Sequence, residues 1–300
     1  MKTEILISTS TFGELDNSPL KKLEQKGFKV TLNPYKRKLV KAELLELLNG
    51  KVGLIAGLEL LDQEVMQKSQ LKVISRCGSG VSNVDLSAAK NLGIAVCSTP
   101  DGPTQAVAEL ALGCLLSLLR QVPQMSEDLH GGKWNKRIGI QLENKNVAIV
   151  GFGRIGRRVA ELMRPFNVRI FAVDPFLKET PPGIELVTLS AALPMCDVVL
   201  IHSAGEGCLF SDKEFSLMKK GAFILNAARG GIIDETALVK ALDSHIVAGA
   251  WVDTFQEEPY SGELMRYPQV ILTPHIGSYT KECRLSMEMQ AVDNLLEFLG

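Results

Sequence analysis

Short runs of apolar residues alternate with helical patterns along the first third of the chain. The runs have the length of buried strands, and the segments between them place apolar residues at helical spacing. Alternation of this kind is typical of a parallel, doubly wound sheet. The predicted strands are 5–7, 28–32, 52–56, 71–74 and 94–97, and the predicted helices lie near 19–26, 41–48, 62–68 and 86–91.

A second alternating run begins near residue 146. It predicts strands at 147–150, 168–173, 198–202, 222–226, 247–251 and 270–272, with helices at 154–165, 212–218 and 235–244. Between the two runs lie a breaker-rich joint at 98–103, a long helix at 104–121 and a polar stretch at 122–145. The long helix is apolar on more than one face, so another domain or another subunit must cover it.

This organisation predicts two similar α/β domains with a cleft between them, which is the usual place for a ligand. The segment 280–299 has helical spacing, and we expect it to cross back onto the first domain. The first domain is then discontinuous, formed by residues 1–99 and 276–300, and the second is formed by residues 100–275.

Three glycines stand between a predicted strand and a predicted helix. Gly151 suits a tight turn, Gly153 lets the backbone approach a pyrophosphate, and Gly156 lets helix and strand pack closely. Asp174 ends the next strand, 18 residues beyond Gly156. A bare three-glycine string is weak evidence, but its place between strand and helix predicts dinucleotide binding. Asp174 suits the ribose hydroxyls of NAD better than the 2′-phosphate of NADP.

Composition narrows the class of protein. The 300 residues are 46% hydrophobic, which is ample for a core, and a net charge of −1 favours neither nucleic acid nor anionic membrane. The six cysteines are scattered, without a C-x-x-C pair or a metal-type cluster with histidine. No secretory or membrane-spanning segment is evident. We therefore expect a soluble, cytoplasmic protein without a metal site.

Three further segments follow predicted strand ends, where open α/β sheets place their sites. Arg229 is either a surface ion pair or a fork for a substrate carboxylate. The acids of 253–258 form either a solvated loop or part of a site, and His275 is either structural or catalytic. All three segments are predicted to lie at the carboxyl edge of the second sheet, and for this reason we consider them together as one candidate site.

Joined, these residue types suit hydride transfer to or from a nicotinamide. The oxygen on the reacting carbon must gain or lose a proton, which a histidine can exchange near neutral pH. A carboxylate orients the histidine and favours its protonated form. An arginine holds the substrate carboxylate beside the reacting carbon and polarises its oxygen.

Over nearly its whole length the chain resembles the D-isomer-specific 2-hydroxyacid dehydrogenases, close to their phosphoglycerate dehydrogenase branch. The resemblance implies a flavodoxin-like catalytic domain, a Rossmann NAD-binding domain, and a homodimer formed through residues 104–134. The matching segments are SRCGSGVSNVDL (75–86), AVAELALGCLLSLLR (106–120), GGKW (131–134), GFGRIG (151–156) with Asp174, NAARGGIIDE (226–235), WVDTFQEEP (251–259) and LTPHIGS (272–278).

The resemblance also implies residue roles. His275 is the acid–base, Glu258 its partner and Arg229 the substrate anchor. Asp253 meets the nicotinamide carboxamide. The residues assigned to NAD are Gly151, Gly153, Arg154, Ile155, Gly156, Asp174 and Asp253, and those assigned to the substrate are Arg76, Ser79 and Gly80.

Two departures from the family pattern bear on the function. After His202 the loop 203–208 is about three residues shorter than usual and lacks its proline-rich pattern, which affects the adenine side. Phosphoglycerate-using members bring more than one arginine to the phosphate, yet only Arg76 matches, and 56–58 has no basic residue. The cluster 36–38 either substitutes or is solvated surface. Because the sequence stops at Gly300, we expect no C-terminal regulatory domain.

The sequence therefore predicts an NAD-dependent oxidoreductase that interconverts a D-2-hydroxyacid and a 2-oxoacid. The first substrate expected is 3-phospho-D-glycerate or a similar phosphorylated acid. The close alternative is a glyoxylate or hydroxypyruvate reductase. A hypothesis from another class, a non-enzymatic NAD-sensing dimeric scaffold, conflicts with the intact set of Arg229, Glu258 and His275.

Overall fold

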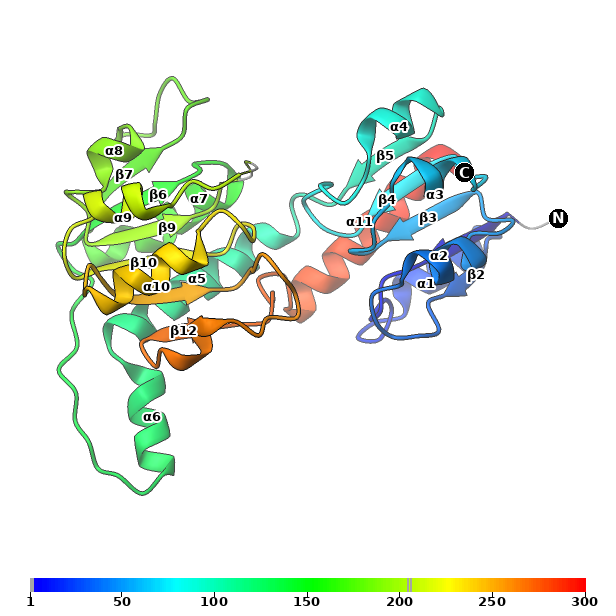
Figure 1. Ribbon diagram of the computed structural model, residues 1–300. Helices are drawn as coiled ribbons and strands as arrows, with labels where there is room; N and C mark the ends of the chain where they lie inside the picture. The colour runs from blue at the N-terminus through cyan, green and yellow to red at the C-terminus, as the bar shows by residue number, and fades with distance from the viewer. Residues whose placement is uncertain (1–2, 204, 206) are drawn as a thin grey trace. The chain divides into compact units, whose positions relative to one another are not determined.

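The chain divides into two compact units, each with its own sheet (Figure 1). The computed structural model describes residues 3–203, 205 and 207–300. Unit 1 comprises Met1–Pro103 and Ser278–Gly300, and unit 2 comprises Thr104–Gly277. These boundaries lie a few residues from the predicted ones, and the assignment of substrate to one unit and NAD to the other stays a prediction at this stage.

Unit 1 is built on a five-stranded sheet with the order β2-β1-β3-β4-β5, in which every pair of neighbours is parallel. This is the flavodoxin-like order. Its strands are β1 (Glu4–Ile7), β2 (Lys29–Leu32), β3 (Gly53–Ala56), β4 (Val73–Arg76) and β5 (Ala95–Ser98), and its helices are α1 (Ser18–Gln25), α2 (Lys41–Leu47), α3 (Gln63–Gln67), α4 (Leu86–Asn91) and α11 (Lys281–Leu299).

Helices cover both faces of this sheet, as its apolar strands require. Alternate strand residues such as Leu54 and Ile74 pack with α2, α3 and α4. The C-terminal helix α11 is capped by the side chain of Thr280, which precedes it, and packs on β3, β4 and β5. A Cβ on Gly53 would lie 2.8 Å from the Leu299 side chain, so the last helix lies directly on β3.

Unit 2 is built on a seven-stranded parallel sheet with the order β12-β11-β10-β9-β6-β7-β8. From β8 to β11 this is the Rossmann order, with β12 added. The strands are β6 (Asn146–Val150), β7 (Arg169–Val173), β8 (Ile184–Leu186), β9 (Val198–Ile201), β10 (Ala222–Asn226), β11 (Val247–Val252) and β12 (Val270–Leu272). The helices are α5 (Pro103–Leu119), α6 (Val122–His130), α7 (Arg154–Met163), η1 (Arg164–Phe166), α8 (Leu189–Ala192), α9 (Asp212–Leu217), α10 (Glu235–Asp243) and η2 (Glu263–Arg266).

Side-chain alternation along β6 divides the core of unit 2 between the two sheet faces. Ala148 and Val150 pack with residues of α8, α9 and α10, whereas Val147 and Ile149 pack with residues of α5 and α7. The long apolar helix α5 is therefore covered on one side by this sheet. The predicted fold class, two doubly wound parallel-sheet domains, is confirmed.

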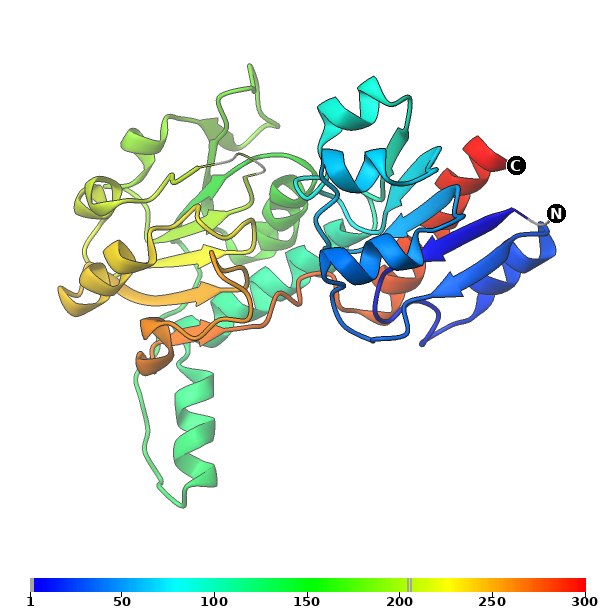
Figure 2. The ribbon, with the colours of Figure 1, turned by 45° about the vertical axis from the view of Figure 1, so that its right-hand side comes forward.

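Helix α6 lies in the stretch 122–145, which the sequence marked only as polar, and the short elements β8 and α8 were not predicted. No residue of α6 is buried, so the helix has no apolar face packed on the rest of unit 2. The sequence therefore lacks the apolar spacing that would have predicted it. The helix stands away from the body of unit 2, and the chain returns beside it (Figures 1 and 2). Among the described residues no single helix is long and apolar enough to cross a membrane. The pair α5 and α6 reaches that length and composition only when taken together, and the two helices are bent by 66°.

Candidate active site

The glycine turn between β6 and α7 has the geometry that its sequence predicts. Gly151 has a φ of 88°, and a Cβ there would lie 2.5 Å from the Ser203 nitrogen. A Cβ on Gly156 would lie 2.3 Å from the Gly151 carbonyl oxygen, so only glycine lets helix and turn approach this closely. A Cβ on Gly153 would meet nothing within 4 Å. The helix N-terminus is thus open to an anion.

Asp174 follows β7 and is fixed beside this turn. Its Oδ2 accepts a hydrogen bond from the Phe152 N–H at 2.9 Å, and its Oδ1 accepts one from the Phe176 N–H at 3.0 Å. The carboxylate therefore has a defined position at the end of the strand. Arg154 and Ile155, also assigned to the cofactor, are the first two residues of α7.

His202 follows β9, which neighbours β6 in the sheet where the strand order reverses. Both of its ring nitrogens are buried and have no hydrogen-bond partner among the described residues. Burial lowers the pKa of the His202 ring to about 4, so the ring is neutral near pH 7. Ala204 and Glu206, in the shortened loop that follows, lie outside the described residues.

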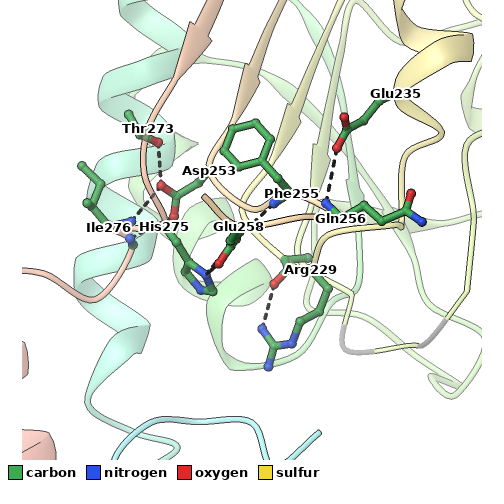
Figure 3. A network of polar contacts seen from close by, with 11 residues as sticks. Arg229, Glu235, Asp253, Phe255, Gln256, Glu258, Thr273, His275 and Ile276 are labelled. Atoms are coloured by element: carbon green, nitrogen blue, oxygen red, sulfur yellow. Dashed lines mark hydrogen bonds and ion pairs between the residues drawn. The ribbon is translucent and has the colours of Figure 1, made fainter. Parts of the chain in front are cut away.

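His275 and Glu258 form a direct pair. The His275 Nδ1 lies 3.1 Å from Oε1 and 3.0 Å from Oε2 of Glu258. Both side chains are more than a third exposed, at 38% and 36%, so the pair is reachable from solvent. Because Nδ1 faces the carboxylate, the Nε2 of His275 is left for another partner (Figure 3).

Arg229 lies on a loop that packs against the loop carrying Glu258. A Cβ on Gly230 would lie 1.8 Å from the Phe255 carbonyl oxygen, so the two loops are in backbone contact. The Asn226 side chain, at the end of β10, donates to the Arg229 carbonyl at 3.0 Å and accepts from the Ala228 N–H at 3.0 Å. The Arg229 Nη1 donates to the Ala228 carbonyl at 2.7 Å, which fixes the guanidinium (Figure 3).

Asp253 follows β11 and is almost fully buried, with 1% exposure. Its Oδ1 accepts from the Thr273 hydroxyl at 2.5 Å and the Ile276 N–H at 2.9 Å, and its Oδ2 accepts from the Gly277 N–H at 2.9 Å. These bonds hold the loop in which His275 has a φ of 54°. The geometry therefore favours a positioning role for Asp253, while its expected contact with the carboxamide stays a prediction.

The three residues expected to bind substrate lie on unit 1, where β4 ends. The Arg76 Nη1 donates to the Cys77 carbonyl at 2.7 Å, and a Cβ on Gly78 would lie 1.2 Å from this nitrogen. Within the described residues, the Ser79 and Gly80 N–H groups donate no hydrogen bond, so both are available to an acceptor such as a carboxylate. Their role in substrate binding stays a prediction.

The residues that hold this site in place were not predicted from the sequence. Asn226 fixes the Arg229 loop, and the Trp251 Nε1 donates to the Thr273 hydroxyl at 2.9 Å. The sequence did contain one indication of these roles. Asn226 and Trp251 carry polar groups near the ends of the otherwise apolar strands β10 and β11. In the described ranges no group of His, Cys, Asp and Glu could hold a metal ion.

Comparison with known proteins gives consistent matches. The family described as "D-isomer specific 2-hydroxyacid dehydrogenase, NAD binding domain" matches residues 112–277. The chain is 37% identical over 305 residues to the D-3-phosphoglycerate dehydrogenase of Rattus norvegicus. This match covers 97% of the chain and 56% of the relative, so the chain spans about half the length of the curated relatives it matches.

Solved structures resemble the whole chain. A protein from Thermus thermophilus aligns with a TM-score of 0.91 and 35% identity, covering 99% of this chain and 97% of that one. A glyoxylate reductase from Paecilomyes thermophila aligns with a TM-score of 0.88 and 27% identity, covering 99% and 95%. Both likenesses extend over both units.

The positioning role of Asp253 can be tested with Asp253→Asn. We expect the free energy of unfolding to fall by about 1–3 kcal/mol, because three donors lose a charged acceptor, while the affinity for NAD changes little. Urea unfolding and NAD titration measure the two effects. Asp212→Asn, at a carboxylate whose side chain is 67% exposed, is the matched control and should change stability by less than about 0.5 kcal/mol. A large loss of NAD affinity with unchanged stability would favour the carboxamide contact instead.

Proposed function

The chain belongs to the D-isomer specific 2-hydroxyacid dehydrogenase family, and from this membership we propose that it is an NAD-dependent enzyme that interconverts a D-2-hydroxyacid and a 2-oxoacid. The observation that carries the proposal is the His275–Glu258 pair with Arg229 on the adjoining loop. All three residues lie in unit 2, most of which matches the family's NAD binding domain.

His275 is the acid–base of the proposed reaction. In the oxidation direction the substrate C2–H bond breaks with its electron pair, and the C2 hydroxyl loses its proton to His275 Nε2. Bound NAD supplies the hydride acceptor. The products are the 2-oxoacid, NADH and a proton held on the imidazole. In the reverse direction the protonated ring returns that proton to the forming hydroxyl.

Glu258 prepares His275 for this role. Its two oxygens lie 3.0 and 3.1 Å from Nδ1, so the ring is oriented and its Nδ1 proton is retained. A neighbouring carboxylate also stabilises the imidazolium that forms when Nε2 takes the proton. The pair therefore favours proton transfer at one defined nitrogen.

Arg229 holds the substrate carboxylate. Its Nη1 is bonded to the Ala228 carbonyl, which leaves the other guanidinium N–H groups to meet two carboxylate oxygens. A fixed positive charge beside C2 also stabilises negative charge that develops on the C2 oxygen. This use of Arg229 explains why its loop is fixed by Asn226.

Two kinds of acid are candidates for the substrate. The first candidate, on the names of the relatives, is 3-phospho-D-glycerate or a similar phosphorylated acid. The second is glyoxylate or hydroxypyruvate, on the missing basic residue at 56–58 and on the likeness to a solved glyoxylate reductase. Rates on a panel of both kinds decide between them.

The protein is further proposed to act as a homodimer in the cytoplasm, joined through the region 104–134 and the return of the chain beside α6. Helix α6 buries no residue, and Trp134 and Ile138 are 78% and 95% exposed. Large apolar side chains gathered on one projecting segment are typical of an interaction surface. The six cysteines are all free, which suits a reducing compartment.

Replacing the proposed acid–base tests the reaction. We expect His275→Ala to lower kcat by about 100- to 10,000-fold, because no group then exchanges the proton, while NAD binding is retained. Steady-state rates and NAD titration measure both. His245→Ala is the control, because His245 is exposed and has a φ of 57°, close to the 54° of His275. In both variants alanine must adopt the same left-handed backbone conformation, so any strain from that conformation is matched. Turnover that survives His275→Ala would retire the assignment.

The preference for NAD over NADP depends on the charge of Asp174. We expect Asp174→Ala to narrow the preference, because the carboxylate no longer repels a 2′-phosphate. Asp174→Asn keeps an acceptor for the Phe152 N–H while it removes the charge, so it separates the charge from the shape of the turn. Dissociation constants for both cofactors give the ratio. An unchanged ratio in both variants would count against the ribose role.

The dimer can be tested on the exposed segment. We expect the purified chain to have the mass of two copies in light scattering, and Trp134→Lys to shift it towards one copy, because a charge would be buried in the contact. Met265→Lys, which replaces an apolar side chain that is 65% exposed elsewhere on unit 2, should leave the mass unchanged. A parent protein with the mass of one chain would refute the dimer.

A further inference from the structure

The side chain of Trp251 reaches from the core of unit 2 to the loop that carries His275. Trp251 lies near the end of β11 and is fully buried, and its ring belongs to the core that includes residues of α5 and α7. An indole N–H that is taken out of water needs an acceptor. Here the acceptor is the Thr273 hydroxyl, 2.9 Å from Nε1, in the loop that follows β12. Core packing therefore fixes one end of a polar connection whose other end lies in the candidate site.

This connection has a single direction. An indole N–H can only donate, whereas a hydroxyl can both accept and donate. Because the Thr273 oxygen accepts from Trp251, its own proton is left for Oδ1 of Asp253, which lies 2.5 Å away (Figure 3). A hydrogen bond to a carboxylate is stronger than one between neutral groups. Trp251 therefore orients the Thr273 hydroxyl towards the carboxylate.

Asp253 transmits this arrangement to the backbone on both sides of His275. Its carboxylate accepts from the Ile276 N–H at 2.9 Å, and its carbonyl accepts from the His275 N–H at 2.9 Å. Before the histidine, the Thr273 N–H donates to the Val252 carbonyl at 3.1 Å. The φ of 54° at His275 is a conformation that persists only when surrounding contacts hold the chain there. The indole hydrogen bond is thus the first link in the series of contacts that fixes the imidazole.

We propose that Trp251 is a positioning residue for His275, acting through the Thr273 hydroxyl and the Asp253 carboxylate. Without the indole N–H the hydroxyl can turn away from the carboxylate, and the loop around His275 loses one of its fixed contacts. The acid–base then leaves the geometry in which Nδ1 faces Glu258, so proton transfer slows while NAD and substrate still bind. This inference rests on the proposed function, because it matters for turnover only if His275 exchanges the proton.

The hydroxyl is tested with two replacements of Thr273 in the full chain, on the acid that the parent protein turns over fastest. Thr273→Val keeps the branched shape but leaves the indole N–H without its acceptor and Asp253 without one donor. We expect kcat to fall at least about tenfold, with KM and the NAD dissociation constant changed by less than about threefold, because a misplaced acid–base loses rate rather than binding. Thr273→Ser restores the hydroxyl and should keep kcat within about threefold of the parent. An equal loss of kcat in both variants would exclude the hydroxyl as the cause.

Trp251→Phe tests the indole itself, since it keeps an aromatic ring in the core and removes the N–H. We expect kcat to fall about three- to tenfold in the parent background and to change by less than about twofold in the Thr273→Val background, because the link is already broken there. Equal losses in both backgrounds, or a loss of stability with kcat unchanged, would mean that Trp251 only fills the core. The control is Phe215→Leu, which removes a ring that is 2% exposed on α9 and should lower stability without changing kcat.

A measurement on the parent protein allows refutation even where a variant does not fold. The chain has two tryptophans, so two indole N–H resonances are expected in its NMR spectrum. The Trp251 N–H should exchange with deuterium at least about a hundredfold more slowly than that of Trp134, which is 78% exposed, because it is buried and hydrogen-bonded. Similar exchange rates for the two would overturn the link from Trp251 to Thr273.

Turnover separates failure of the inference from failure of the proposed function. Absence of turnover by the parent protein on every 2-hydroxyacid and 2-oxoacid overturns the proposed function, and the positioning role with it. Turnover by the parent protein together with an unchanged kcat in Thr273→Val overturns the positioning role alone.

Discussion

The carboxylate of Asp253 is the group on which the candidate site depends most. Almost fully buried, it accepts hydrogen bonds from the Thr273 hydroxyl and from the Ile276 and Gly277 N–H groups. These bonds draw the loop after β12 against the end of β11. His275, inside that loop, is held with a φ of 54°, a conformation that costs free energy unless surrounding contacts enforce it. The orientation of the histidine towards Glu258 follows from this constraint.

The parallel sheet of unit 2 brings together residues that are far apart in the sequence. All strands of such a sheet end at one edge, so the loops after β10, β11 and β12 bring Arg229, Asp253 and His275 to the same side of unit 2. The edge of unit 1 has the same organisation, with Ser8, Gly57 and Cys77 after β1, β3 and β4. The strands are fixed by core packing, whereas the loop residues remain free to set charge and specificity.

The sequence predicted the elements whose signal is local. Strands such as β6 and β10 are apolar runs buried on both faces, and the glycine turn carries its own geometry. The edge strand β8 was missed because it is three residues long and partly polar, and α6 was missed because it has no buried face. The pairing of Ser8 with Glu59 joins residues 51 positions apart, and no local pattern marks such a contact.

Identity to relatives supports the family and the reaction class, but it does not identify the acid. Most of the segments that match the family lie in unit 2, where they build the glycine turn and the His275 loop. These segments carry the residues proposed to bind NAD and to exchange the proton, so the reaction class has support that the choice of acid lacks. The residues predicted to bind the substrate, Arg76, Ser79 and Gly80, lie instead where β4 of unit 1 ends, and their role stays a prediction.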